Sequence, residues 1–264
     1  MSEMQKFVTS CLLGAAREIG KARRAGLSIK AKGRNDMATS ADLAAEKFIV
    51  GRIAREFPDS IVLSEESYLK ADVEHESLFV IDPIDGTHNF IQGIPLWGVS
   101  IAHYSGGLPT AGGIYLVPQQ ELLYAEKGKP ATLGGKKISV TKTEKLEDFF
   151  LLCDTRLHRI SEQGYLPRLV EIEKASQHTR FLGSTVHDMG YVACGRADAC
   201  MSFRLKPYDF AAAAFIAERA GATVTDLEGK KWGLGTVKFL ASNGRQHGRI
   251  LDVLHGKKES TTRA

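Results

Sequence analysis

The sequence has 264 residues, of which 43% are apolar and 25% are charged, so it can bury a large core and is not typical of a disordered chain. The net charge is +4, from 35 basic and 31 acidic residues, which gives little support for a dedicated nucleic-acid surface. No apolar run reaches the ~18 residues of a membrane span, and the N-terminus shows no signal peptide. The four cysteines form no CxxC pair, and we expect a reduced, cytoplasmic protein without membrane contact.

Two helices are predicted at the start of the chain. Apolar residues recur at three- and four-residue steps over residues 3–25, and Gly26 follows as a stop signal. A second helix is expected over residues 41–57. Thr39 and Asp42 have the spacing of a capping box at its start. Asp42 could therefore be only the acid of this cap.

Short strands are expected to follow the two helices. The apolar runs at residues 61–63 and 78–81 each stop at acidic residues. Residues 96–104, 111–118 and 121–128 are short apolar segments separated by Gly or Pro turns, which is typical of an antiparallel meander.

Strands and helices are expected to alternate in the second half of the chain. We expect strands at residues 149–154, 197–203, 222–226 and 237–243, and helices at 162–175, 185–195, 208–221 and up to about 254. The fold class predicted is α+β, with an N-terminal half over residues 1–145 and a C-terminal half over residues 146–255. Residues 256–264 are expected to be a disordered tail.

The stretch "VIDPIDGTHNF", residues 80–90, places two acidic residues at the end of a buried strand. Pro83 is expected to end that strand, and a turn would then bring Asp82 and Asp85 together. Two neighbouring carboxylates repel each other unless a cation lies between them. Mg²⁺ prefers such oxygen ligands, and the Ile84 carbonyl is a further candidate. A simple Asp-Pro turn is the structural alternative.

Gly86 and Thr87 open the next segment. Glycine allows the backbone to approach a ligand closely, and free amides at a helix start bind anions. A cation site beside an anion site is the arrangement that phosphoryl chemistry uses.

Three further carboxylates lie at the ends of predicted elements. Glu65 and Glu66 follow the run at residues 61–63, and Asp209 precedes an alanine-rich helix, where we expect it to be the N-cap. Each of these residues has an ordinary structural explanation by itself, and Glu66 is expected to be solvated. Together they have the layout of a shared metal site.

Four motifs together resemble the inositol monophosphatase family, including its extragenic suppressor (SuhB) type. "DPIDGTHNF" resembles the family signature DPIDGTTNF, "LSEES" resembles GEES, "PYDFAAAAFIAERAGA" resembles WDxAAG…EAGG, and "NDMATSADLAAEKFI" resembles the segment D-x-V-T-x-A-D…E. They occur in the family's order and cover nearly the whole chain. The resemblance implies a layered α-β-α-β-α sandwich of the inositol monophosphatase / fructose-1,6-bisphosphatase type, a homodimer, and a phosphatase that uses Mg²⁺ and is inhibited by Li⁺.

The resemblance also implies which residues bind metal. Glu65, Asp82 and the Ile84 carbonyl would hold one Mg²⁺, and Asp82, Asp85 and Asp209 would hold a second. Two or three Mg²⁺ per site are expected, with Mn²⁺ or Ca²⁺ as substitutes.

Catalytic roles follow from the same resemblance. Glu65 and Thr87 would orient and activate the attacking water, with Asp42 hydrogen-bonded behind Thr87. The amides of Gly86 and Thr87 would receive the phosphate, and Asp85 would also contact the substrate.

The choice of substrate is less well marked. The resemblance places Gly183, Ser184 and Thr185 along the substrate, together with Ser202, which stands where inositol-specific members carry a glutamate. Losing that charged group should broaden or change the choice of alcohol. His187 stands where the family has an apolar residue, and we expect it to be a core histidine rather than a substrate contact.

These observations rank the candidate functions. Hydrolysis of inositol-1-phosphate or other polyol phosphates is expected first. Histidinol phosphate is an alternative, because "RLKPYD" is similar to histidinol phosphatases, although His88 stands where those tend to carry arginine. A SuhB-like role with RNA, ribosomes or the transcription machinery is left open by the basic residues between positions 21 and 34 (Lys21, Arg23, Arg24, Lys30, Lys32 and Arg34) but is not indicated by them.

Overall fold

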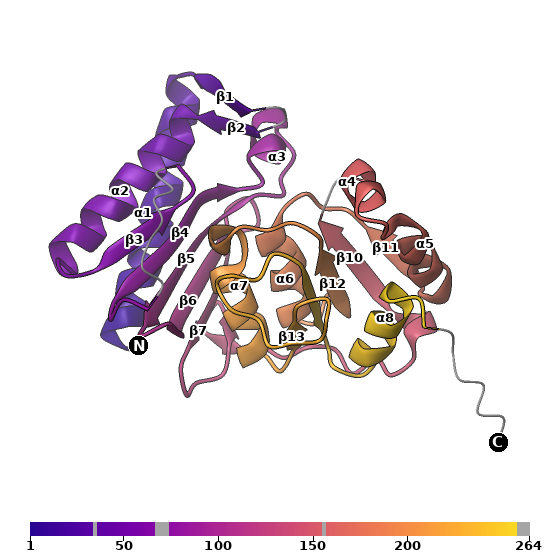
Figure 1. The fold of residues 1–264 in the computed structure, drawn as a ribbon. Coiled ribbons are helices and arrows are strands. Elements are labelled where there is room, and N and C mark those ends of the chain that lie inside the picture. The colour runs from indigo at the N-terminus through magenta and orange to yellow at the C-terminus, as the bar shows by residue number, and fades with distance from the viewer. Residues whose placement is uncertain (34–35, 67–73, 155–156, 258–264) are drawn as a thin grey trace.

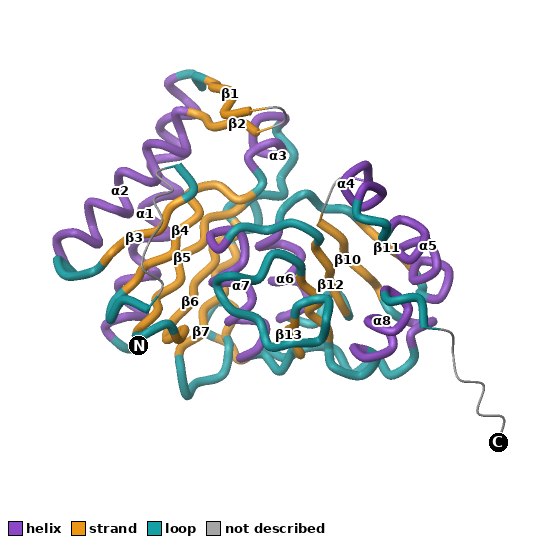
Figure 2. The backbone as a smooth tube through the Cα atoms, viewed as in Figure 1, coloured by secondary structure: helices purple, strands orange, loops and turns teal. Residues whose placement is uncertain are grey.

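The structure is a computed structural model of the chain, and it describes residues 1–33, 36–66, 74–154 and 157–257. Figure 1 shows helices and sheets stacked in alternating layers. The order is α-β-α-β-α, as expected. Figure 2 shows the backbone in the same view as a tube, with the helices in purple and the strands in orange.

The first layer contains the two N-terminal helices, α1 (Glu3–Ala25) and α2 (Ser40–Glu56). Ser2 caps α1 by accepting from the backbone of Gln5. The hairpin β1 (Ile29–Gly33) and β2 (Asp36–Thr39) joins the two helices. The apolar faces of α1 and α2 pack on the first sheet, in a cluster that includes Leu12 and Ile49.

The first sheet has seven strands in the order β3-β4-β5-β6-β7-β8-β9. Their bounds are β3 (Ile61–Ser64), β4 (Leu78–Asp85), β5 (Gly98–Ser105), β6 (Leu108–Leu116), β7 (Glu121–Glu126), β8 (Thr132–Leu133) and β9 (Lys136–Lys137). β4 to β9 pair antiparallel with their neighbours, so the expected meander is confirmed, and β3 runs parallel to β4. Both faces of this sheet are covered, which explains why β4 is buried along its whole length.

The middle layer contains α6 (Thr185–Ala193) and α7 (Pro207–Arg219). The buried alanines of α7 let it lie close to the first sheet, where the backbone of Ala212 approaches Gly112 of β6. The core around these helices joins residues of both sheets, for example Val80 and Cys200.

The second sheet has five strands in the order β11-β10-β12-β14-β13. Their bounds are β10 (Phe150–Asp154), β11 (His178–Arg180), β12 (Ala199–Ser202), β13 (Thr223–Thr225) and β14 (Phe239–Ser242). The outer layer consists of α4 (Leu157–Glu162), α5 (Leu166–Ala175) and α8 (His247–Leu254), whose apolar side chains form a third cluster with Phe149 and Leu240. The chain passes from the first sheet to the second between Lys137 and Phe150, through the short 3₁₀ helix η1 (Leu146–Asp148).

One predicted helix is wrong in its extent. Residues 162–175 do not form a single helix, because α4 ends at Glu162 and α5 begins at Leu166. Gly164 adopts a left-handed conformation with φ 76, which ends a helix, and Pro167 lies in the first turn of α5.

Two further expectations concern the ends and the surface of the fold. Of the expected disordered tail, residues 258–264 lie outside the described residues. None of the helices in the described ranges combines the length and apolarity needed to cross a membrane.

Candidate active site

Acidic residues gather at one edge of the first sheet. In the parallel pair of β3 and β4, Ser64 lies beside Ile81. Glu65 follows β3 directly and Asp82 is the next residue of β4 after Ile81, so both leave the ladder at the same edge. Figure 1 shows α3 (Thr87–Gln92) above this end of β4.

β4 does not end at Pro83, and this prediction is wrong. The pairing with β5 continues, with Asp82 opposite Ser100 and Asp85 opposite Gly98, and the register shifts between the two pairs. Such a bulge tolerates proline because the extra residue is unpaired. Asp82 and Asp85 therefore flank a bulge inside a strand rather than a turn after it.

Asp82 lies at the centre of the acidic group. Its side chain is only 1% exposed, and one of its oxygens, Oδ1, accepts from the Ile84 amide at 3.0 Å. Burial raises the pKa of this carboxyl well above its usual value, and the surrounding carboxylates raise it further; these are Glu65, Asp85, Asp209 and Asp42. The five acids were all singled out from the sequence, and the fold brings them together from four different segments.

Asp42 makes contacts that match both of the roles considered for it. Thr39 donates to Asp42 Oδ2 from its backbone amide at 2.8 Å and from its hydroxyl at 2.5 Å, which completes the expected capping box of α2. The other oxygen, Oδ1, lies 3.5 Å from the Thr87 hydroxyl, which also donates to the Ile84 carbonyl at 2.9 Å. The helix cap thus fixes a carboxylate directly behind Thr87.

Gly86 is required by the backbone at the start of α3. It has φ 84, and a Cβ built on it would lie 2.8 Å from the Leu96 carbonyl oxygen. Only glycine meets both conditions without strain. The amides of Gly86 and Thr87 lie between the bulge of β4 and α3, next to the acidic group.

Asp85 is held by the N-terminus of α6. Its Oδ1 accepts from the Thr185 amide at 3.2 Å, and its Oδ2 accepts from the Val186 amide at 3.1 Å and from the Ser184 hydroxyl. These donors stabilise a negative charge. The predicted substrate residues Ser184 and Thr185 thus lie in direct contact with Asp85, and Gly183 precedes them in the same loop.

Asn89 was not singled out from the sequence, although it lies in the quoted motif. Its side-chain amide donates to the carbonyls of Leu96 and Leu182, both at 2.8 Å, and to that of Gly183 at 3.3 Å. It ties α3 to the loop that leads into α6. An amide in a motif otherwise rich in acids was the only sign of this role.

Asp209 is not the N-cap of α7, contrary to the prediction. The helix begins at Pro207 with Lys206 as its N-cap, and Asp209 accepts from the Lys206 amide at 2.6 Å through Oδ2. Asp209 thus lies in the first turn of α7, and its carboxylate accepts from the amide of the N-cap residue. Its charge acts on Asp82, so α7 contributes to the same acidic group.

The composition of this acidic group fits a hard divalent cation. In the described part of the chain, no three acidic, histidine or cysteine side chains stand in a ready-made metal arrangement, and Asp85 and Asp209 turn oxygens toward backbone amides. A carboxylate oxygen has two lone pairs and can accept an N–H while it binds a cation. The available ligand atoms are all oxygens, and a cation among these carboxylates would offset the burial and repulsion that raise the pKa of Asp82.

Two of the predicted residues remain to be placed. Glu66 is half-buried and follows Glu65 in a turn. Ser202 is the buried last residue of β12, at the carboxyl end of the second sheet.

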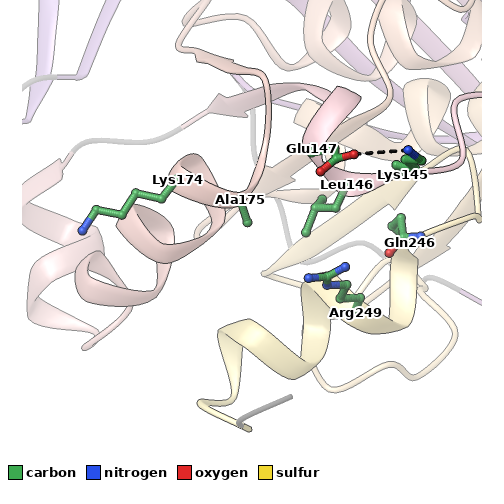
Figure 3. A pocket seen from close by; sticks show the side chains of 7 residues that line it. All are labelled: Lys145, Leu146, Glu147, Lys174, Ala175, Gln246 and Arg249. Carbon is green, nitrogen blue, oxygen red and sulfur yellow. Dashed lines mark hydrogen bonds and ion pairs between the residues drawn. The ribbon is translucent and has the colours of Figure 1, made fainter. Parts of the chain in front are cut away.

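Another hollow, of about 400 Å³, lies at the opposite end of the second sheet and is shown in Figure 3. It is lined by Lys145, Leu146, Glu147, Lys174, Ala175, Gln246 and Arg249. Its one carboxylate, on Glu147, pairs with Lys145 at 3.4 Å, and Lys174 extends away from the other side chains. It lacks the grouped acids of the edge at β4, so we do not regard it as the active site.

The chain is similar to known proteins over most of its length. The family model described as "Inositol monophosphatase family" matches residues 1–259. A fructose-1,6-bisphosphatase/inositol-1-monophosphatase of Thermotoga maritima is 33% identical, over 86% of this chain and 85% of its own length. A Nus factor SuhB of Xylella fastidiosa is 34% identical, over 86% of this chain and 84% of its own length.

Solved structures show the same similarity. The extragenic suppressor protein suhB of Bartonella henselae superposes with a TM-score of 0.90 at 30% identity, covering 98% of this chain and 100% of that one. A staphylococcal inositol monophosphatase-1, solved as an inhibitory complex soaked in 100 mM LiCl, has a TM-score of 0.86 at 25% identity, covering 98% and 96%. On the family match and these identities, the chain belongs to the inositol monophosphatase family.

Proposed function

We propose that this chain is a Mg²⁺-dependent phosphatase that hydrolyses phosphate monoesters at the edge of the first sheet. The observation that carries the proposal is the convergence of four carboxylates on the buried Asp82, whose pKa they raise together with burial. Such a cluster is costly unless cations neutralise it, and it lies beside the amides of Gly86 and Thr87.

The inositol monophosphatase family is generally metal-dependent. We assign one Mg²⁺ to Glu65, Asp82 and the Ile84 carbonyl, and a second to Asp82, Asp85 and Asp209, with a third ion, Mn²⁺ or Ca²⁺ substitution and Li⁺ inhibition as further expectations. When bound, Mg²⁺ supplies positive charge to the phosphate oxygens and lowers the pKa of water.

The chain's own residues would then position the reactants. Glu65 and Thr87 orient the attacking water, and Asp42 fixes Thr87 from behind, since one of its oxygens lies 3.5 Å from the Thr87 hydroxyl. The amides of Gly86 and Thr87 hold the phosphate. In phosphoryl transfer most of the rate gain comes from such positioning and electrostatic stabilisation.

Inositol-1-phosphate is the first substrate candidate. The relative from Thermotoga maritima is named as an inositol-1-monophosphatase and fructose-1,6-bisphosphatase. Gly183, Ser184 and Thr185 would line the alcohol, together with Asp85 and Ser202. An uncharged serine at position 202 favours a broad range of polyol phosphates over strict choice. We also propose a cytoplasmic homodimer.

The test is phosphate release by purified protein with Mg²⁺ from a panel of monoesters, including inositol-1-phosphate, fructose-1,6-bisphosphate and histidinol phosphate. We expect turnover of at least one polyol phosphate, loss of turnover with EDTA, and inhibition by Li⁺. The variant Asp82→Asn should be inactive, and the exposed control Asp59→Asn should match the wild type. Absence of phosphate release across the panel would refute the proposal.

A second candidate is a SuhB-like role in transcription, which rests on the Xylella fastidiosa relative named as a Nus factor. The basic residues between positions 21 and 34, such as Lys21, Arg23 and Arg24 at the end of α1, are also compatible with it. A binding role of this kind should survive Asp82→Asn, whereas the phosphatase role should not.

A further inference from the structure

His187 is a fully buried histidine one turn into α6. Its Nδ1 lies 2.8 Å from the Ser184 hydroxyl oxygen, and that hydroxyl in turn donates to Oδ2 of Asp85. The imidazole is thus one hydrogen bond removed from the acidic group and does not line its surface.

The other ring nitrogen of His187 faces Gln119. Nε2 lies 3.2 Å from Oε1 of Gln119, and the Gln119 amide donates to the Pro95 carbonyl at 2.6 Å. An edge contact with the Tyr191 ring fixes the plane of the imidazole. Burial lowers the pKa of His187 to about 4, so the ring is neutral at pH 7 and carries one N–H. Because the Ser184 hydroxyl gives its hydrogen to Asp85, that N–H lies on Nδ1 and donates to the Ser184 oxygen, and the approach of Nε2 to Gln119 is a contact rather than a second hydrogen bond.

We infer that His187 is a positioning residue for Asp85: by holding the Ser184 hydroxyl in place, it orients the carboxylate for cation binding. The inference deepens the proposed function, because it rests on the assignment of Asp85 to the second Mg²⁺. Asp85 also accepts from the backbone amides of Thr185 and Val186, which the helix fixes, whereas the Ser184 hydroxyl is a donor that can rotate. A serine hydroxyl turns freely about its Cα–Cβ and Cβ–Oγ bonds unless a second group fixes it.

Packing alone does not require an imidazole at this position. An apolar side chain of similar volume could fill the space under Tyr191 but would leave Ser184 without its second partner, inside a buried site. Groups that orient a metal ligand typically change metal affinity or activity by about 10–100-fold when removed.

Three variants of His187 separate a positioning role from a role in packing alone. Asn places a polar atom near the position of Nδ1, Gln places one near Nε2, and Leu places none. With Mg²⁺ binding measured by calorimetry, we expect Kd to rise about 10-fold in His187→Leu and His187→Gln, and to stay within about 3-fold in His187→Asn. The half-saturating Mg²⁺ concentration for phosphate release should shift in parallel.

A double-variant cycle gives the sharpest readout. Ser184→Ala should weaken Mg²⁺ binding, and adding His187→Leu to it should change Kd no further, because His187 acts through Ser184. A purely structural histidine would give additive losses. If His187→Leu does not fold, as judged by its melting transition, the Asn and Gln variants in the Ser184→Ala background decide in the same way.

The outcomes also separate this inference from the proposed function. Wild-type protein that binds Mg²⁺ but releases no phosphate would refute the phosphatase and leave the positioning role standing. An unchanged Mg²⁺ Kd in His187→Leu and His187→Gln, additive losses in the cycle, or no Mg²⁺ binding by the wild type would each overturn the positioning role.

Discussion

The Thr87 hydroxyl lies 3.5 Å from Oδ1 of Asp42, a residue 45 positions earlier in the chain. The cap of α2 holds the far oxygen of Asp42, so the near oxygen has a fixed position relative to Thr87. The capping hydrogen bonds of α2 thereby fix a carboxylate of the acidic group at the edge of the first sheet.

This relationship predicts the effect of substitutions at Thr87. Thr87→Ala removes the hydroxyl and should lower kcat about 10²–10⁴-fold, the usual contribution of a positioned proton-transfer group. Thr87→Ser keeps the hydroxyl and should stay within about 10-fold of the wild type. Steady-state phosphate release measures both, and equal kcat for the two variants would contradict the role given to the hydroxyl.

Gly86 should not tolerate a side chain. Gly86→Ala must adopt φ 84 and place a Cβ 2.8 Å from the Leu96 carbonyl, so we expect a loss of about 1–3 kcal/mol in the free energy of unfolding and a strong loss of turnover. Denaturant unfolding measures the first quantity.

Gly51→Ala in α2 is the matched control for this substitution. A Cβ at Gly51 meets nothing within 4 Å and the residue is helical. The change should leave activity unaltered and raise stability by about 0.4–1 kcal/mol. Equal effects of the two glycine substitutions would contradict the role assigned to Gly86.

Metal-free protein should lose stability as the pH rises. The raised pKa of Asp82 means that the folded state keeps a proton which the unfolded state releases above its ordinary value of 3.8. The stabilisation is thus complete below that value and is lost as the pH rises toward the folded-state pKa. In EDTA, Asp82→Asn should flatten the fall of Tm with increasing pH, and Asp59→Asn should not.

Mg²⁺ provides a second check on the same group. It should raise the Tm of the wild type at pH 7.5, because a ligand that binds only the folded state stabilises it. The increase should be much smaller in Asp82→Asn. Scanning calorimetry with and without EDTA measures both effects, and equal increases would show that Asp82 does not hold the cation.

His247 should act on stability in the opposite direction. It is buried between Ser242 and Thr225, at 2.8 and 2.9 Å from their hydroxyls, and burial lowers its pKa to about 4. A depressed pKa of a base gives stability that is present above about 6.5 and is lost as the pH falls toward 4, by up to about 1.4 kcal/mol per pH unit.

His247→Leu removes this titration. The variant should show a shallower fall of Tm between pH 6.5 and 4.5 than the wild type. Substitution of the exposed His255 by Gln is the control and should leave the slope unchanged. A wild-type slope in His247→Leu would mean that other groups govern stability in acid.

Local patterns predicted several features of the fold that depend on neighbours in sequence, although the hairpin of β1 and β2 was expected to be a loop. The apolar period predicted α1, the spacing of Thr39 and Asp42 predicted the cap of α2, and the Gly and Pro turns predicted the meander of the first sheet. β4 continues past Pro83 because it pairs with β5. That pairing depends on tertiary structure, so a local rule about proline could not predict it.

The same distinction applies to the site. The acids could be singled out because carboxylates at the ends of buried strands are unusual in any sequence. The partners of Asn89 are mostly backbone carbonyls, one of them 93 residues away, and His187 meets Gln119 across 68 residues. Contacts of this kind have no periodic or compositional signature.

The hold of α6 on Asp85 spans about 100 residues of chain. During synthesis the nascent chain therefore presents Glu65, Asp82 and Asp85 well before the amides and hydroxyl that fix the last of them exist. We expect a fragment that ends before α6 to bind divalent ions weakly and without selectivity. Catalytic activity should then appear in one step, when the second sheet and α6 pack against the first sheet.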